Sequence, residues 1–481
     1  MSILSVYFVA FLLLLSAVYY ITPNKIKPII ILVGNFYFYY QFGLTHLSFL
    51  LFSTLTVFAG AILLEKAQKS TTKKAVLWLV LFINIGFLFY SKFTPYLLNL
   101  AQKIVTFNST NILKTVVVPI GISFYTLQVC GYLIDVYREK YCAEKNLLKF
   151  TAFATFFPLM LQGPISRYDQ LANQIYNKAK PKDIYRNFTY GSQLMLWGFF
   201  KKLVIADRAA ILVNEVFDNY SSYSGWNVII AILLYTIQIY TDFSGCVDIC
   251  RGAAQLFGID VIENFNQPYF AKSTQDFWRR WHIALSSWFR DYIYISLGGN
   301  RKGIFRKYLN ILIVFFVSGL WHGVGIHYIV WGLMQGAFQI IGAVTNPVKE
   351  KICAKLKINR EIGLPLFIQH FITFILINLS WLVFRANGTI AAIEMFKSIF
   401  TFSPQSMVNL THLDMIILVI SLLIVFSVSY YKEKGYSIRN EMAKQILPIR
   451  WGIFLLLFIA VVLFGIYGPG YSDSAFIYMN F

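Results

Sequence analysis

One histidine lies inside a long apolar stretch of this sequence, where an ionisable group is costly and is expected to have a function. His322 falls within Leu309–Val344, which is long enough for two short membrane spans. Gly319, Gly323 and Gly325 surround it, and they permit close backbone or ligand approach and a break in the helix. A neutral imidazole takes a proton from a hydroxyl near neutral pH, so His322 is a candidate general base. A structural histidine that bonds across helices fits the same position equally well.

A second set of polar residues follows one face of the segment Thr274–Leu297, for which we predict a helix. The apolar residues of this segment recur at steps of three and four, which is typical of one helix face. The polar residues along another face are Arg279, His282, Ser286 and Arg290. Such a face fits a helix at the membrane interface or one that lines a water-filled cavity, and the alternative is an interfacial anchor with snorkelling arginines.

Three shorter segments hold further polar candidates. Asp242 stands at the end of an apolar run and is a candidate for orienting a histidine or pairing with an arginine, although capping of a following helix is the commoner role. The nearby Ser244 lacks the GxSxG surroundings of a nucleophile elbow. Asn266 belongs to the polar loop Glu263–Tyr269, for which we expect turn structure. The pair Lys201–Lys202 ends another apolar run and is interpreted as a topology signal.

The composition predicts a membrane protein. Of the 481 residues, 57% are hydrophobic and 13% are charged, whereas soluble domains carry about 25% charged residues. The net charge of +20 comes from Lys and Arg clustered in short loops between apolar runs, which is typical of cytoplasmic loops and argues against a nucleic-acid partner. The five cysteines form no CxxC or Cys/His zinc pattern, so we predict no metal site.

The apolar runs predict about eleven or twelve membrane crossings, some of them in the middle of the chain only partly inserted. These runs lie roughly at 3–21, 28–42, 45–64, 75–93, 114–135, 150–165, 187–214, 226–241, 308–344, 364–384, 413–430 and 451–468. An extracytoplasmic N-terminus places the most basic loops in the cytoplasm and the loops near 42–45, 94–112 and 386–412 outside. The C-terminal tail after Gly468 is then also extracytoplasmic.

We therefore predict an all-α integral membrane protein that forms a single polytopic domain over residues 1–481. N-terminal spans (1–137) and C-terminal spans (347–481) flank a core (138–346) with re-entrant and amphipathic segments. Five of the ten tryptophans fall between Trp278 and Trp331, and aromatic residues prefer the membrane–water boundary, so this core is expected to hold the mouth of a cavity.

Nine short motifs between about residues 120 and 335 occur in an order that chance would not produce. They are Gly121–Tyr125, Gly163–Pro164, Gly198–Lys202, Asp242–Gly245, Glu263–Asn266, Phe277–His282, Trp288–Tyr292, Gly298–Arg301 and Gly319–Gly323. Together they resemble the membrane-bound O-acyltransferase (MBOAT) family, and within it the branch of bacterial alginate O-acetyltransferase membrane subunits. Cys246 departs from that branch, which commonly has an aromatic residue at this position.

The resemblance implies a bundle around a central passage, an acyl donor that approaches from the cytoplasm and an acceptor that arrives from outside. It implies His322 as the catalytic histidine, and we expect His282, which matches the second recurrent histidine of the family, to belong to the catalytic site as well and to position the donor or acceptor. The residues expected to bind substrate are Arg279, Arg290, Asp242, Ser244, Trp321 and Asn266. The expected donor is acetyl-CoA or another acyl thioester, which is a substrate, and we expect no permanently bound cofactor.

The function that the resemblance implies is O-acetylation of an exported or cell-surface polysaccharide at the cell membrane. The expected partners are the lipid bilayer, an extracytoplasmic SGNH-type acetyltransferase and the polysaccharide acceptor. D-alanyl transfer from a carrier protein to teichoic acid is an alternative within the same family. A transporter or flippase, with histidines along a substrate path, is the alternative from another class.

Overall fold

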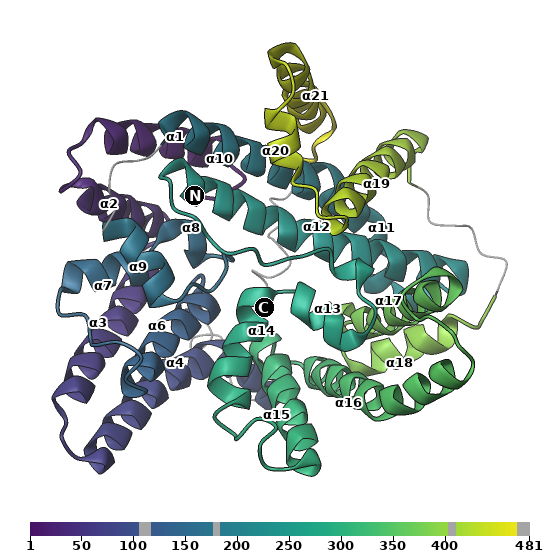
Figure 1. Ribbon diagram of the computed structural model, residues 1–481, viewed down its shortest axis with the longest axis horizontal. Helices are drawn as coiled ribbons and strands as arrows, with labels where there is room; N and C mark the ends of the chain where they lie inside the picture. Colours follow the sequence, from purple (N-terminus) through teal and green to yellow (C-terminus); the bar gives the residue numbers. More distant parts are fainter. Residues whose placement is uncertain (105–116, 177–182, 403–409, 469–481) are drawn as a thin grey trace. The chain divides into compact units, whose positions relative to one another are not determined.

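The computed structural model describes residues 1–104, 117–176, 183–402 and 410–468, which form helices joined by loops (Figure 1). Over these ranges no strand occurs, and a single isolated β-bridge joins Phe265 to Trp281. Eight of the described helices are long and apolar enough to cross a membrane, and a shorter apolar helix, α1 (Val6–Ile21), accompanies them. The predicted all-α membrane fold is therefore confirmed.

The long helices match most of the predicted crossings. They are α3 (Leu44–Lys66), α4 (Ser70–Ile104), α12 (Trp226–Leu256), α15 (Ile304–His322), α16 (Ile326–Lys355), α17 (Gly363–Arg385), α19 (His412–Glu433) and α21 (Leu447–Phe464). The predicted runs 28–42 and 114–135 overlap the shorter helices α2 (Lys27–Tyr40) and α6 (Ile122–Tyr137). The predicted end at 93 is wrong, because α4 continues through Pro95. The rest of that predicted loop, and the tail after Gly468, lie outside the described residues.

The chain divides into two compact units. The first unit comprises Met1–Met195 and Val247–Ile262, and the second comprises Leu196–Cys246 and Glu263–Phe481. The helices α10 (Ile184–Phe199) and α12 contribute residues to both. The predicted division of the chain at 137 and 346 stays a prediction.

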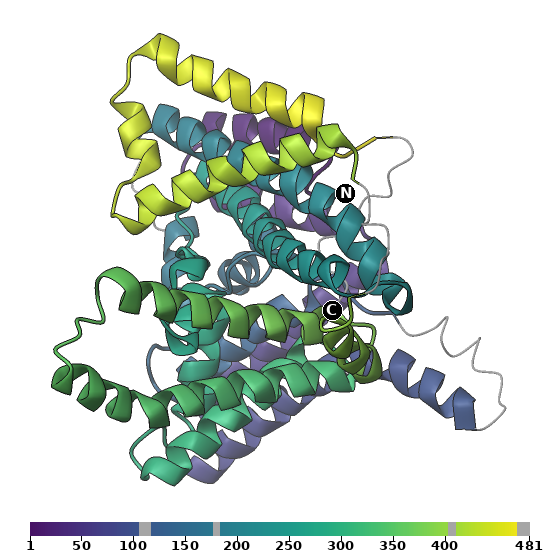
Figure 2. The same cartoon turned by 90° about the vertical axis from the view of Figure 1, so that its right-hand side faces the viewer.

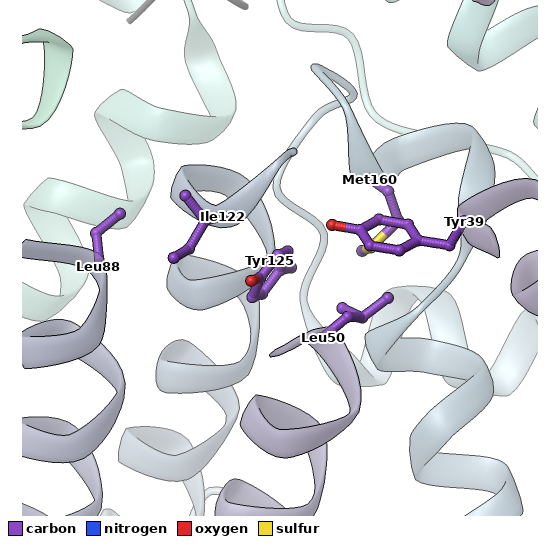
Figure 3. Packing of buried hydrophobic residues seen from close by; sticks show 6 residues of the cluster. All are labelled: Tyr39, Leu50, Leu88, Ile122, Tyr125 and Met160. Carbon is purple, nitrogen blue, oxygen red and sulfur yellow. The ribbon is translucent and has the colours of Figure 1, made fainter. Parts of the chain in front are cut away.

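In the first unit, α3 packs against α4 and α6, and α2 packs against α7 (Leu147–Ala154). Side chains from five helices, including the short α8 (Phe157–Met160), form one apolar core (Figure 3). They are Tyr39, Leu50, Leu88, Ile122, Tyr125 and Met160. Lipid offers no hydrogen bonds, so buried polar groups must pair within the protein. Asn35 does so by donating to Thr155 Oγ1 (3.2 Å) and accepting from the Phe157 N–H (3.0 Å).

In the second unit, α15 and α16 form a tightly packed antiparallel pair, and α16 also packs on α17 (Figure 2). A Cβ atom at Gly319 would lie 2.4 Å from the carbonyl oxygen of Tyr328. A Cβ atom at Gly332 would lie 2.2 Å from the carbonyl oxygen of Phe315. Glycine at these positions therefore permits the close backbone approach. Further elements of this unit are η1 (Phe200–Ala206), α11 (Asp207–Asp218), η2 (Tyr220–Ser222), η3 (Pro268–Phe270), α18 (Thr389–Ser398) and α20 (Ile438–Ala443).

The prediction of one continuous helix over Thr274–Leu297 is wrong. The segment forms α13 (Thr274–Arg280), α14 (Ile283–Phe289) and the π-helical turn η4 (Arg290–Tyr294). The break falls at Trp281, which is extended, and at His282, whose φ of 46° is left-handed. Histidine is among the residues that adopt this conformation more readily than most.

The loop before α13 supplies the hydrogen bonds that compensate for the break. The Asn266 N–H donates to the Arg280 carbonyl (2.9 Å), and the Ile283 N–H donates to the Asn264 carbonyl (3.0 Å). These bonds flank the bridge between Phe265 and Trp281. A continuous helix would satisfy these groups locally, whereas here a distant loop does so and turns His282 inward.

Candidate active site

His322 is the last residue of α15, and its ring is enclosed by aromatic side chains. The helix ends because Gly323 is extended, and α16 begins three residues later. The imidazole is buried, with ring centroids 4.8 Å from Trp321, 5.0 Å from Trp331 and 5.4 Å from Phe384. All three contacts are edge-to-face, an arrangement that aromatic pairs favour. The predicted break between two spans at this glycine-rich site is confirmed.

The position of His322 at a helix C-terminus also matters electrostatically. The aligned peptide dipoles of a helix place partial negative charge at its C-terminal end. A positive charge that develops on the imidazole is stabilised there by about 0.3–1 kcal/mol, and by up to about 2 kcal/mol where the site is shielded from water. The end of α15 therefore offsets part of the cost of placing that charge on a buried side chain.

A buried polar chain lies beside this aromatic enclosure. The Trp278 indole N–H donates to Gln335 Oε1 (3.0 Å), and Gln335 Nε2 donates to Ser380 Oγ (2.7 Å). The ring of Trp331 stacks on that of Trp381 at 6.0 Å and 16°. These contacts join α13, α16 and α17 around the residues that surround His322.

His282 is also buried, but it is held by hydrogen bonds. Its Nδ1 lies 3.3 Å from Asn264 Oδ1, which also accepts from the Ala284 N–H at 2.9 Å. Because Asn264 Oδ1 is an acceptor, the proton of the neutral imidazole resides on Nδ1, and Nε2 is the basic nitrogen. Burial lowers the pKa of His282 from 6.5 to about 3, so the ring is neutral at physiological pH.

The ring of Trp321 connects the two histidines. Its centroid lies 6.1 Å from His282 and 4.8 Å from His322. His282 also packs edge-to-face with Phe243, at a centroid distance of 4.7 Å. Three of the predicted site residues, His282, Trp321 and His322, are thus brought together inside the second unit.

Asp242 and Ser244 lie within α12, so the interpretation of Asp242 as the cap of a following helix is wrong. Asp242 Oδ1 accepts from Lys202 Nζ at 2.6 Å, and Lys201 Nζ donates to Ser244 Oγ at 2.8 Å. Lys202 Nζ also lies 2.8 Å from Asp207 Oδ1. Asp242 therefore pairs with a lysine, a partner that we did not predict for it.

Both lysines are buried, so their interpretation as topology signals at the end of a span is wrong. They belong to the π-helical η1, and such segments occur frequently at functional sites. Glycine allows α12 to lie close to them, since a Cβ atom at Gly245 would stand 2.9 Å from the Gly198 carbonyl oxygen. The sequence did contain one indication that these lysines belong to the site. The motif Gly198–Lys202 is among the nine that resemble the MBOAT family.

The other predicted binding residues lie on the surface of the described chain. Arg279 is exposed, and the exposed Arg290 pairs with Asp291 at 2.9 Å. Asn266 is exposed too, and its side chain accepts from Gln267 Nε2 at 3.2 Å. In this polar loop it is Asn264 that contacts His282, a residue that we did not single out from the sequence.

A sequence model of the membrane-bound O-acyltransferase family matches residues 34–384, which include both histidines and the buried lysines. The chain belongs to the membrane-bound O-acyltransferase family. It is therefore an O-acyltransferase with a multi-pass membrane fold, as the motifs predicted.

The chain is similar to several individual members of the MBOAT family. The chain is 31% identical to "Probable alginate O-acetylase AlgI" of Pseudomonas putida, and the match covers 99% of each chain. It is 31% identical to "Peptidoglycan O-acetyltransferase" of Helicobacter pylori over 81% of this chain and 76% of the relative. It is 29% identical to "Teichoic acid D-alanyltransferase" of Bacillus subtilis over 44% of this chain and 56% of the relative.

Proposed function

We propose that this protein is a membrane O-acetyltransferase that takes an acetyl group from cytoplasmic acetyl-CoA for O-acetylation of an exported or cell-surface polysaccharide. The observation that carries the proposal is the similarity to an alginate O-acetylase along 99% of both chains. The peptidoglycan O-acetyltransferase, whose acceptor is also a cell-surface polysaccharide, matches over 81% of this chain. The D-alanyltransferase matches over less than half of it.

His322 acts as the general base in this proposal. It takes the proton of the acceptor hydroxyl, whose oxygen then forms a bond to the thioester carbonyl carbon. The tetrahedral intermediate collapses, the C–S bond breaks, and His322 returns the proton to the leaving thiolate. The C-terminus of α15 favours the imidazolium that exists between these two proton transfers. General-base help of this kind contributes roughly 10²–10⁴-fold to the rate.

His282 positions a substrate and does not take the proton. Its Nδ1–H is tied to Asn264, so its Nε2 is the nitrogen that can accept a hydrogen bond from a hydroxyl. The contact of both histidines with Trp321 places this acceptor in the neighbourhood of His322. A neutral His282 therefore orients a hydroxyl toward His322, the general base that contacts the same ring.

The acetyl group passes from the cytoplasmic donor to an extracytoplasmic acceptor in this proposal. The exposed Arg279 and Arg290 are assigned to the anionic groups of the donor, since guanidinium groups bind phosphates well. The acceptor is a sugar hydroxyl or the serine of an extracytoplasmic SGNH-type partner. The protein lies in the cell membrane with both termini extracytoplasmic, which agrees with the placement of its basic loops.

The test uses the full chain in lipid nanodiscs with acetyl-CoA and an oligosaccharide acceptor. We expect acceptor-dependent release of the CoA thiol and an acetylated product, both nearly abolished by His322→Ala in a folded protein. Wild-type rates in that variant would remove His322 from the proposed role. Movement of a substrate across the membrane without any thioester cleavage would instead favour a transporter.

D-alanyl transfer is a second candidate because a teichoic acid D-alanyltransferase is among the relatives. The same nanodiscs are given a D-alanyl carrier protein in place of acetyl-CoA. We expect this thioester to remain intact. Its cleavage, with acetyl-CoA untouched, would replace the proposed donor and acceptor while leaving the general base in place.

A further inference from the structure

Three tryptophans near His322 differ in what their indole N–H groups meet. Trp278 Nε1 donates to Gln335 Oε1 at 3.0 Å. The Nε1 atoms of Trp331 and Trp381 are buried and find no acceptor in the described part of the chain. Both of these side chains are 0% exposed, so solvent does not reach them either.

An indole N–H buried without an acceptor costs free energy, and folded proteins satisfy the great majority of such groups. Trp331 lies in α16 and Trp381 in α17, and lipid supplies no acceptor to helices of this kind. Two such donors in contact with one another therefore require an explanation. Because an indole N–H can only donate, the group that satisfies it must be an acceptor, such as a carbonyl oxygen or an oxyanion.

The positions of the two rings indicate which acceptor this is. The Trp331 ring meets the His322 ring at 5.0 Å and 89°, and the Trp381 ring stacks on Trp331 at 6.0 Å. Phe384 packs against all three rings, at 5.4 Å, 4.9 Å and 5.5 Å respectively for His322, Trp331 and Trp381. The two donors thus belong to the wall around the candidate general base.

We infer that Trp331 and Trp381 donate their indole N–H groups to the carbonyl oxygen of the acyl donor and stabilise the oxyanion formed from it. This inference rests on the proposed acyl transfer. As the acceptor oxygen bonds to the carbonyl carbon, the π electron pair of C=O moves onto the oxygen, and the two N–H groups stabilise its charge. When the C–S bond breaks, that pair re-forms C=O, and the thiolate leaves with the proton from His322. Trp331, whose ring touches His322, makes the larger contribution.

The test compares the same substitution at the three tryptophans in the full chain in nanodiscs. Trp331→Phe is expected to lower kcat by about 10²–10³-fold, with little change in the KM for acetyl-CoA, because the lost bond strengthens in the transition state. Trp381→Phe is expected to lower kcat less. The matched control is Trp278→Phe, which leaves Gln335 Oε1 without its donor. This variant should lower the thermal midpoint and change kcat little.

A second measurement separates a lost donor from a disturbed fold. Replacing Trp331 with its benzothienyl isostere keeps the ring volume and removes only the N–H. The infrared carbonyl stretch of bound ¹³C-acetyl-CoA should lie at lower frequency in the wild type than in this variant. Equal frequencies, or a kcat for the Trp331 and Trp381 variants within about twofold of the Trp278 control, would overturn the inference, given that removal of a single oxyanion donor costs about 10²-fold or more. If the wild type itself cleaves no thioester, the proposed acyl transfer is wrong, and the roles of Trp331 and Trp381 are wrong with it.

Discussion

His282 and His322 both contact the ring of Trp321, but they lie in different backbone settings and among different neighbours. His282 sits at a left-handed backbone position and bonds through Nδ1 to an amide oxygen. His322 sits at the end of a helix and is packed by the edges of three aromatic rings. The hydrogen bond to Asn264 selects one tautomer of His282, and the ring edges around His322 fix the plane of its imidazole.

Because of this difference, the two histidines can have separate roles in the site. Burial keeps His282 neutral, and the hydrogen bond to Asn264 selects one tautomer, which suits a residue that orients a hydroxyl. His322 is as buried as His282, but the helix C-terminus beside it offsets part of the cost of the positive charge that forms when it takes up a proton.

The largest effect is expected at His322. His322→Gln removes the general base and should lower kcat by roughly 10²–10⁴-fold, while the thermal midpoint in detergent changes little. The matched variant is His282→Asn, since asparagine tolerates the left-handed backbone of this position. Thiol release from acetyl-CoA measures both. A loss of kcat in His282→Asn as large as that in His322→Gln, at saturating substrate, would show that the two tasks are not separate.

The next largest effect, a loss of stability, is expected at the buried ion pairs of Lys202, which lie close to His282. Phe243 contacts His282, and its neighbour Asp242 pairs with Lys202. Lys202→Met leaves Asp207 and Asp242 as buried carboxylates beside one another, which should destabilise the protein by about 3–5 kcal/mol. Unfolding by denaturant measures the change, and Ser244→Ala should cost less because it removes only one hydrogen bond to Lys201. Equal losses in the two variants would argue against an ionic set centred on Lys202.

Much of the fold around His322 was predictable from the sequence. A long apolar run interrupted by closely spaced glycines indicates two spans with a break, and α15 and α16 have this form. The pattern is local, so a single sequence contains it. The ordered motifs then identified the family, which a model matched over residues 34–384 confirms.

The surroundings of His282 were not predictable in the same way. The segment has the periodicity of a helix, but distant groups of the loop at Asn264–Asn266 compete for its backbone and break it at Trp281. Periodicity reports which side chains are apolar and not which backbone groups find partners elsewhere. The buried role of Lys202 was missed for a related reason, since its partner Asp242 lies 40 residues away.

A smaller effect is expected at the amide that holds His282. Asn264→Ala removes the acceptor of the His282 Nδ1–H and of the Ala284 N–H, so it should destabilise the protein by about 1–3 kcal/mol and raise the KM for the hydroxyl acceptor. The matched control is Asn266→Ala, two positions away, where the side chain is exposed. Thermal unfolding and acceptor titration measure the two variants. The same change in both would mean that the tether of His282 has no special importance.

The smallest effect is a pH dependence of stability that His282 alone confers. The unfolded chain protonates His282 below a pKa of 6.5, whereas the folded chain holds its pKa at about 3. Between these values the unfolded state binds more protons, so acidification favours unfolding. At pH 5.5 the cost is about 1.4 kcal/mol, and above pH 7.5 it vanishes.

His282→Asn removes this titration, so its free energy of unfolding should fall less than that of the wild type between pH 7.5 and pH 5.5. Other groups titrate equally in both proteins, and the difference between the two therefore isolates His282. Denaturant unfolding at the two pH values measures it. Parallel changes in the two proteins would mean that folded His282 takes up a proton as readily as the unfolded chain does, and its assignment as the permanently neutral partner of His322 would be wrong.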